Sequence, residues 1–143
     1  MAAADYSFPV QLVLVRRRGP GGHEPLGYPA SIKIVRVPCS GRIDPMFILK
    51  SFERGADMVL VSGCHPGDCH YSSGNYHARR KLMAFRELVE FLGIDPRRFK
   101  FSWVSAAEGA KWSSLVKEIT AEALELGPFE AFPSAARREE VKK

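Results

Sequence analysis

Residues 58–75 read MVLVSGCHPGDCHYSSGN, and this stretch decides the fold. Its first part, Met58 to Ser62, is a largely apolar run, which is typical of a strand buried in a parallel sheet. A loop from Gly63 to Asn75 follows, and a long amphipathic helix is predicted from about Tyr76 to Leu92, closed by Gly93. The apolar residues at helical spacing in it are Leu82, Phe85, Val89 and Leu92. This order of strand, loop and helix indicates one unit of an α/β protein.

Similar units flank this one on both sides. Apolar runs predict strands at Val10–Val15, Ser31–Pro38 and Phe99–Val104. A helix is predicted to start at Asp44-Pro45, because Asp44 can cap the free N–H groups and Pro45 suits the first helical position. Its apolar stripe comprises Phe47, Ile48 and Phe52, and Gly55 follows its end.

The last helix is predicted to begin at a capping box, in which Ser105 caps the helix and Glu108 occupies its third position. The predicted core face, up to the helix end at about Leu126, comprises Trp112, Leu115, Ile119 and Leu126. The whole order predicts an α/β fold with a small doubly wound, mostly parallel four-stranded sheet of flavodoxin-like outline. Between the first two strands, residues 16–29 (RRRGPGGHEPLGYP) take the place of a helix, and we interpret them as a degraded crossover.

The length of 143 residues and mass of 15.9 kDa fit one domain. We expect this domain to span residues 9–132, between a flexible N-terminus at 1–8 and a charged tail at 133–143. The sequence shows neither a secretory signal nor an apolar window long enough to span a membrane. Three cysteines are an odd number and too few for a disulfide scaffold, so we expect a cytoplasmic protein that uses cysteine for metal or redox chemistry.

The formal net charge of +5 permits an anionic partner. No run of Lys and Arg is interleaved with aromatic residues, so the charge does not indicate nucleic-acid binding. The sequence also has no G-x-x-x-x-G-K-[ST] phosphate-binding loop.

All three cysteines follow predicted strands. Cys39 follows the second strand, and Cys64 and Cys69 follow the third. Because sites in open α/β sheets form at the carboxyl ends of strands, we expect the three thiols to lie at one edge of the sheet. With His65 or His70 as a fourth ligand, they would form a set of the kind that holds an iron–sulfur cluster.

Three other interpretations of these cysteines stay open. They are small apolar core residues, or they bind zinc, although the paired Cys-x2-Cys or His-x3-His spacing of structural zinc sites is missing. Alternatively, Cys64 is a nucleophile with His65 or His70 as its base, but no third member of a catalytic set follows. Because no complete catalytic set is present, we do not expect an independent enzyme.

The loop Gly63–Asn75 has thirteen residues, more than the roughly two to six that are usual between a strand and a helix. Long loops of this kind are usually functional, so we expect this one, with Arg42 and Tyr71, to be a docking surface. Basic residues in the first turns of the next helix are predicted to contact the same partner: Arg79, Arg80 and Lys81. Cations at that position oppose the helix dipole, and an acidic partner would compensate them.

Three segments together resemble a known family. They are CSGRIDPMFILKSFERGADMVLVSGCHPGDCHYSSGN (residues 39–75), RRFKFSWVSAAEGAKWSSLV (97–116) and LGPF (126–129). The chain resembles the delta subunit of methyl-viologen-reducing (F420-non-reducing) hydrogenases over roughly Tyr28 to Phe129. The resemblance implies a small electron-transfer subunit with a [2Fe-2S] cluster, in which Cys39, Cys64 and Cys69 match family cysteines near the cluster.

The same resemblance implies two partners. One is an electron donor, such as a hydrogenase or formate dehydrogenase, and the other is a flavin-containing heterodisulfide reductase. Neither nucleic acid nor a membrane span is expected.

One stretch departs from the family pattern, which usually has a Cys-x-x-Cys pair just after the first strand. Here residues 16–24 read RRRGPGGHE, without cysteine. Two hypotheses follow. Either the cluster is held differently, with His23, His65 or His70, or the chain is a cluster-less interaction subunit of a heterodisulfide-reductase-like assembly, for example a sulfur-oxidising one.

Overall fold

The computed structural model describes the backbone of residues 11–15 and, in full, residues 32–69, 71–105 and 107–130. The strands are β1 (Gln11–Val15), β2 (Ile32–Arg36), β3 (Met58–Gly63) and β4 (Phe99–Trp103). The α-helices are α1 (Pro45–Glu53), α2 (Gly74–Phe91) and α3 (Gly109–Leu126), and the short 3-10 helices are η1 (Ser40–Arg42) and η2 (Pro96–Arg98). The predicted α/β class is confirmed. None of the described helices is long and apolar enough to cross a membrane.

The four strands form one sheet in the order β2-β1-β3-β4. Strands β3 and β4 are parallel, but β1 runs antiparallel to both of its neighbours, with Val13 opposite Ile34 on one side and Leu60 on the other. The prediction of a mostly parallel sheet is therefore wrong for β1, and its direction departs from the flavodoxin-like outline. The physical reason is that two antiparallel neighbouring strands can be joined without a helical crossover. The interpretation of residues 16–29 as a degraded crossover is therefore wrong.

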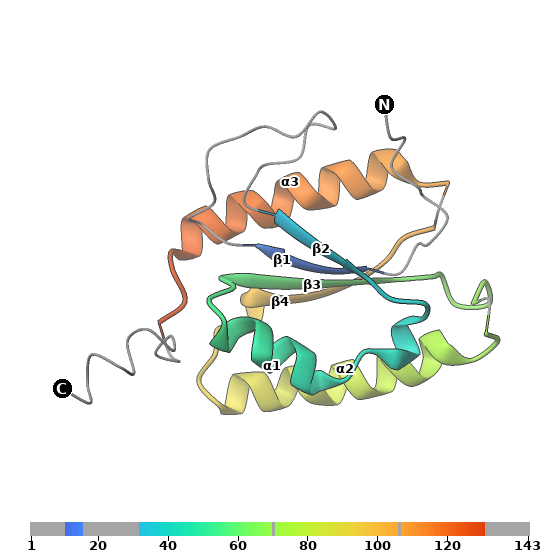
Figure 1. Cartoon of the computed structure of the whole chain (residues 1–143), viewed down its shortest axis with the longest axis horizontal. Helices are drawn as coiled ribbons and strands as arrows, with labels where there is room; N and C mark the ends of the chain where they lie inside the picture. The colour runs from blue at the N-terminus through green and yellow to red at the C-terminus, as the bar shows by residue number, and fades with distance from the viewer. Residues whose placement is uncertain (1–10, 16–31, 70, 106, 131–143) are drawn as a thin grey trace.

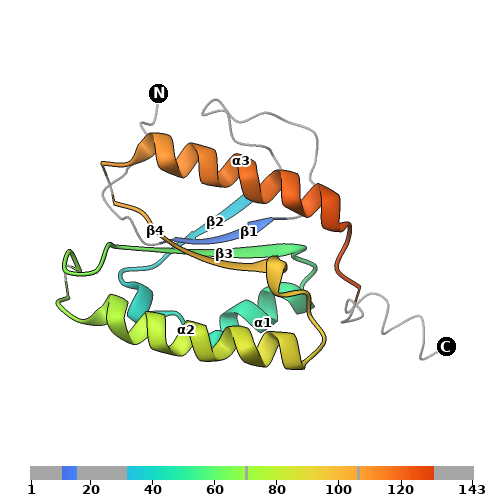
Figure 2. The same ribbon diagram turned by 180° about the vertical axis from the view of Figure 1, so that it is seen from behind.

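Helices cover both faces of this sheet (Figures 1 and 2). Helix α3 lies on one face, and α1 and α2 lie together on the other. Each layer encloses its own cluster of buried side chains: one joins α1 and α2 to β3 and β4, and the second joins α3 to β3. All six residues of β3 are buried, as its apolar sequence predicts.

Helix α1 begins as predicted. The Asp44 side chain accepts a hydrogen bond from the Met46 N–H at 2.8 Å, and Pro45 is the first helical residue. Gly55 has a φ of +94°, which ends the helix. Ile48 and Phe52 are buried as predicted, but Phe47 is exposed, because it lies about 100° around the helix from Ile48.

Helix α2 starts two residues earlier than predicted. Leu82, Phe85 and Val89 are buried in the core as expected. Leu92 is exposed, because it follows the last helical residue and no longer continues the buried face.

Helix α3 starts at Gly109, later than the predicted cap at Ser105. The Glu108 side chain does reach back to the Ser105 N–H, at 2.8 Å, but Glu108 itself occupies the cap position. The buried face comprises Trp112, Val116, Ile119 and Ala123. Leu115 and Leu126 are only partly buried against this cluster, so the predicted core face was correct at two of its four positions.

Candidate functional site

A pair of cysteines lies where η1 meets the start of α2. Cys39 follows β2 and precedes η1, and Cys69 belongs to the loop between β3 and α2. The two Sγ atoms are 3.9 Å apart, although the residues are 30 positions apart in the chain. Figures 1 and 2 show η1 beside the first turn of α2, so the site joins two segments that α1 and β3 separate in the chain.

Gly74, the first residue of α2, makes this close approach possible. A Cβ atom on Gly74 would collide with Cys39 Sγ and would lie 3.4 Å from Cys69 Sγ. A Cβ atom on Gly41 would lie 3.0 Å from the carbonyl oxygen of Gly74, so η1 and α2 also touch through backbone. The two glycines therefore leave the space that the sulfur atoms occupy.

The two thiols have different electrostatic environments. Burial raises the pKa of Cys39, and this effect outweighs the hydrogen bond from the Gly41 backbone. Burial also opposes ionisation of Cys69, but backbone N–H groups of Asn75, Tyr71 and Gly74, together with Cys39, lower its pKa. Two of these N–H groups belong to the free N-terminus of α2, which stabilises negative charge. Cys69 is thus the thiol that ionises more readily.

The third cysteine has different surroundings. Cys64 is half-buried and packs against the core cluster between the sheet and the two helices α1 and α2. Asn75, which is fully buried, holds the backbone beside it: the Asn75 amide donates to the carbonyl oxygens of His65 (2.8 Å) and Cys64 (3.4 Å). The oxygen atom Oδ1 of Asn75 has no hydrogen-bond partner among the described residues.

His65 is tied to the neighbouring strand end. Its Nε2 atom lies 2.6 Å from the Glu108 carboxylate, which also accepts the N–H of Ser105. The Ser105 N–H, His65 and Lys111 together lower the pKa of Glu108. His70 and His23, the other candidate ligands, lie outside the described residues.

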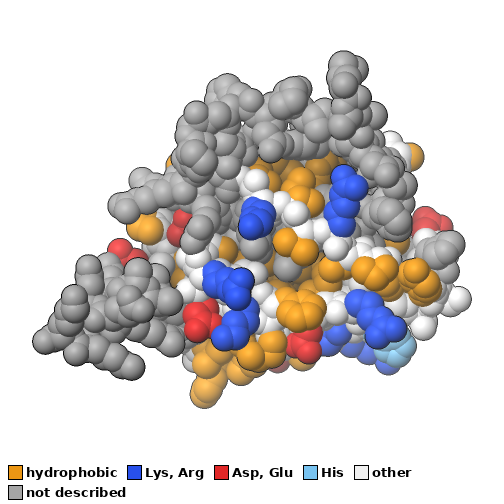
Figure 3. Space-filling view, in the orientation of Figure 1, with side chains coloured by type: hydrophobic (Ala, Val, Ile, Leu, Met, Phe, Trp, Pro, Cys, Tyr) orange, Lys and Arg blue, Asp and Glu red, His pale blue; other side chains and the backbone are white. Residues whose placement is uncertain are grey.

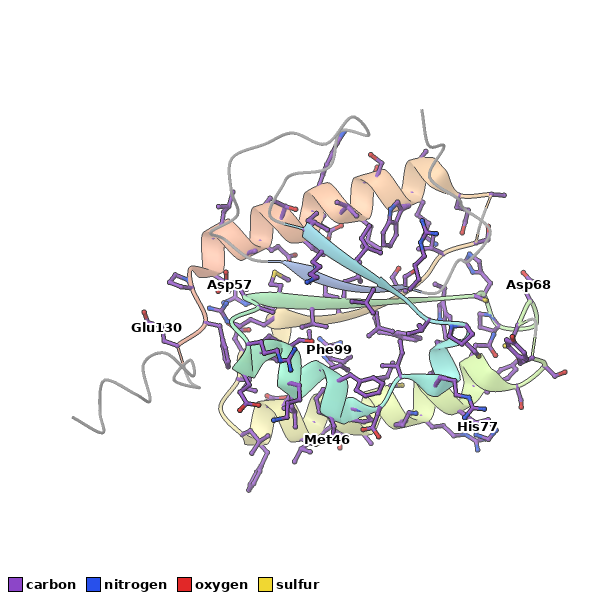
Figure 4. All side chains as sticks on the ribbon, in the orientation of Figure 1. Met46, Asp57, Asp68, His77, Phe99 and Glu130 are labelled. Carbon is purple, nitrogen blue, oxygen red and sulfur yellow. The ribbon has the colours of Figure 1, made fainter. Side chains whose placement is uncertain are left out.

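A pocket of about 440 Å³ opens beside the cysteine pair. Its lining comprises Pro38, Cys39, Gly41, Arg42, Tyr71, Ser73, Gly74 and His77. Figure 4 shows His77 near the start of α2 and Asp68 toward the tip of the loop, and Figure 3 shows Lys and Arg side chains beside a histidine at that corner. The predicted docking residues Arg42 and Tyr71 thus share one pocket.

The basic residues of α2 fall into two groups. Lys81 is half-buried and donates a hydrogen bond to the Gly41 carbonyl oxygen at 3.1 Å, so it holds η1 in place. Arg79 and Arg80 are exposed, and neither side chain forms a hydrogen bond or ion pair with the part of the chain that the structure describes. Because α2 starts at Gly74, these residues lie in its second turn, within the first turns of the helix as predicted.

Known proteins similar to this chain identify its family. The family described as "Methyl-viologen-reducing hydrogenase, delta subunit" matches residues 21–127. The chain belongs to this family. It is 48% identical to an iron-sulfur subunit of the F420-non-reducing hydrogenase of Archaeoglobus profundus, over 71% of this chain and 74% of the relative. The corresponding vhc iron-sulfur subunit of Methanococcus voltae is also 48% identical, over 71% and 70%.

A different kind of relative matches over a small part of its own length. It is a subunit of the ferredoxin:CoB-CoM heterodisulfide reductase of Methanosarcina mazei, and we refer to it as the long reductase subunit. This relative is 40% identical over 76% of the present chain, but over only 14% of its own length. A segment similar to this member of the family is therefore built into a much longer polypeptide.

The [2Fe-2S] cluster that the family resemblance implies can be tested against these residues. A cluster of this type takes four protein ligands. In residues 32–69, 71–105 and 107–130, no group of three or more Cys, His, Asp and Glu side chains is arranged to hold a metal ion. Cys39 and Cys69 supply two sulfur atoms, and this donor set does not fit the cluster.

The sequence did not reveal two features of the site. The contact of His65 with Glu108 has no local signal, because the residues are 43 positions apart. Gly74 does have a local signal. Glycine is unfavourable for helix formation, so a glycine at the first position of a long helix indicates a role other than helix stability.

Proposed function

We propose that this chain is a docking component of a heterodisulfide-reductase-type complex, which joins a protein similar to the long reductase subunit to an electron donor of the hydrogenase type. The observation that carries this proposal is the match to the long reductase subunit of Methanosarcina mazei, in which a similar segment is part of the same polypeptide. Segments that are fused in one protein commonly bind each other when they are separate chains. The cytoplasmic location expected from the cysteine content belongs to this proposal.

The structure favours the cluster-less version of this component. The described residues bring two sulfur atoms together, where a [2Fe-2S] cluster takes four ligands. The version with a cluster is the second candidate, because several relatives are named iron-sulfur subunits. In that version Cys64 and one of His23, His65 and His70 would complete the ligand set with Cys39 and Cys69.

Iron and sulfide analysis separates the two versions. We expect anaerobically purified protein to hold less than one full cluster per chain and to lack the visible absorption of an iron–sulfur protein. Two irons and two sulfides per chain would instead establish the version with a cluster. His65→Ala would then be the first variant to test for its loss.

The proposed docking surface is the pocket together with the exposed arginines of α2. Tyr71 offers an exposed aromatic ring, and Arg42, Arg79 and Arg80 offer positive charge. An acidic partner surface would be attracted to these charges, which mainly raises the rate of association.

Association with a protein similar to the long reductase subunit, taken from the same organism as this chain, tests the surface. We expect the double variant Arg79→Ala/Arg80→Ala to bind roughly tenfold more slowly at low salt. Lys81 is left intact, because it supports η1. The matched control is Lys33→Ala/Lys117→Ala, which removes the same charge from exposed positions on β2 and α3. If the arginine variant binds normally and a chain truncated after Phe132 does not bind, the contact lies in the tail and not on this surface.

A further inference from the structure

The pair of sulfur atoms at Cys39 and Cys69 has a chemistry of its own. Their distance of 3.9 Å is a non-bonded contact, and oxidation would shorten it to the roughly 2.05 Å of a disulfide. The two sulfur atoms come from backbone segments that can approach closely because Gly41 and Gly74 carry no Cβ atom. A disulfide here would need only local movement of the two side chains.

The surroundings divide the pair into an attacking and a resolving thiol. Cys69 is half-buried, so its sulfur is the more accessible of the two to an external reagent. Cys39 is only 7% exposed, so it is the less accessible of the two. This asymmetry is what thiol–disulfide exchange requires, because one thiolate must react first and a neighbouring thiol must complete the exchange.

The pocket gives an external reagent access to the pair. Cys39 lines it together with Arg42, Tyr71 and His77. A small molecule bound there would therefore lie next to Cys39, whose Sγ atom is 3.9 Å from that of Cys69.

We propose that Cys39 and Cys69 form a reversible dithiol–disulfide pair that exchanges two electrons with an organic disulfide. The Cys69 thiolate attacks one sulfur of that disulfide, which releases one thiolate and leaves a mixed disulfide on Cys69. The Cys39 thiol gives its proton to solvent, and its sulfur then attacks Cys69 Sγ and releases the second thiolate. Both released thiolates take up protons. The pair is oxidised by two electrons, and the organic disulfide is reduced to two thiols.

This pair would give the protein redox activity without a cluster. Among the described residues, no third Cys, His, Asp or Glu side chain joins the two sulfur atoms in a group that could hold a metal ion. A two-electron couple also suits a partner that handles electrons in pairs. The inference does not depend on docking, because it concerns isolated protein.

The test uses the full chain with its three cysteines. Reduced protein is equilibrated with mixtures of reduced and oxidised glutathione, quenched in acid, alkylated and mapped by mass spectrometry. We expect the number of alkylated thiols to fall from three to one, with the loss of two hydrogen atoms and a Cys39–Cys69 peptide. The matched control Cys64→Ser is expected to form the same disulfide. Cys39→Ser is expected to keep glutathione bound to Cys69.

Several results would overturn the proposal. They are three alkylated thiols in a large excess of oxidised glutathione, a disulfide that includes Cys64, or iron or zinc that protects both Cys39 and Cys69 until a chelator is added. If Cys39→Ser fails to fold, as judged by circular dichroism, the wild-type map still decides. Because no partner is present, failure here leaves the proposed docking function standing, and loss of docking leaves the disulfide result unchanged.

Discussion

The carboxylate of Glu108 lies 2.6 Å from the imidazole Nε2 of His65, and this contact joins the loops that follow β3 and β4. These two strands are parallel neighbours, so their ends lie side by side. The contact braces the loop that leads from β3 to Cys69. It therefore links the segment resembling the family in residues 97–116 to the cysteine pair.

The Glu108 contact predicts a pH-dependent contribution to stability. The pKa of Glu108 is lowered below its ordinary value of 4.5, by the Ser105 N–H first and then by His65. A carboxyl group with a lowered pKa in the folded state stabilises the protein above the pKa of the unfolded state, and this stabilisation is lost as the pH falls through the folded-state pKa. We expect Glu108→Gln to be less stable than wild type at neutral pH, and the difference to vanish in acid.

Urea unfolding of both proteins across the acid range measures this difference. The matched control is Glu87→Gln on α2, whose side chain forms no hydrogen bond or ion pair within the described residues. A pH-dependent loss of the same size in the control would assign the effect to general charge and not to the contact with His65.

Local elements of this fold were predictable from the sequence, because their signals are local. The cap at Asp44, the glycine at position 55 and the spacing of Leu82, Phe85 and Val89 each depend on neighbours within a few turns. The direction of β1 was not predictable in this way. An apolar strand can pair with a parallel or an antiparallel neighbour. The connection between β1 and β2, which determines the direction, has an irregular sequence.

The candidate site was predictable in part. The rule that sites form at strand ends placed Cys39 and Cys69 at one edge, and the structure brings them together. The structure does not place Cys64 beside this cysteine pair, because the side chain of Cys64 packs against the hydrophobic core. Whether a cysteine after a strand lies in the core or at the site depends on tertiary packing, which the spacing of residues in the sequence does not determine.

Phe85 anchors α2 to the sheet, so its truncation tests the core. The ring is 4% exposed and meets Phe99 edge to face, with 5.5 Å between ring centres. We expect Phe85→Ala to lower the free energy of unfolding by about 3–5 kcal/mol, as measured by denaturant unfolding, because it leaves a cavity in the core.

Two controls on the same helix accompany this variant. Phe91 is 87% exposed, and Arg80 is exposed as well. Phe91→Ala and Arg80→Ala are each expected to change stability by less than about 0.5 kcal/mol. A larger loss at Phe91 than at Phe85 would show that the helix presents the opposite face to the sheet.

Arg98 is a buried cation that secures the end of α3. Its guanidinium donates hydrogen bonds to the backbone carbonyl oxygens of Asp57, Leu126 and Gly127, at 2.9–3.0 Å. Burial lowers the pKa of this group, but an arginine stays charged, and three carbonyl groups compensate its desolvation. We expect Arg98→Ala to lower the free energy of unfolding by roughly 3 kcal/mol, because it leaves one buried and two partly buried carbonyl groups without this donor.

The neighbouring arginine is the control for this prediction. Arg97 is exposed and pairs with Asp95 at 2.7 Å on the surface. Thermal unfolding of Arg97→Ala is expected to show a loss below about 1 kcal/mol, as is usual for surface ion pairs. Equal losses for the two variants would mean that the backbone contacts of Arg98 contribute little.

Gly74→Ala tests the close approach of η1 to α2. The new Cβ would collide with Cys39 Sγ, and the first turn of a helix has little freedom to move away. Overpacking of this kind is expected to lower the free energy of unfolding by about 1–3 kcal/mol. Because the two sulfur atoms would be pushed apart, disulfide formation between Cys39 and Cys69 is expected to slow by roughly a hundredfold.

Gly109→Ala separates this effect from helix propensity. Gly109 is the first residue of α3, as Gly74 is of α2, but a Cβ on Gly109 meets no atom within 4 Å. Alanine there is expected to be neutral or to stabilise the protein by up to about 1 kcal/mol, because it reduces the freedom of the unfolded chain. Both unfolding and the rate of disulfide formation are measured for the two variants. If Gly74→Ala behaves like Gly109→Ala in both, Gly74 does not hold the space in which the sulfur atoms meet.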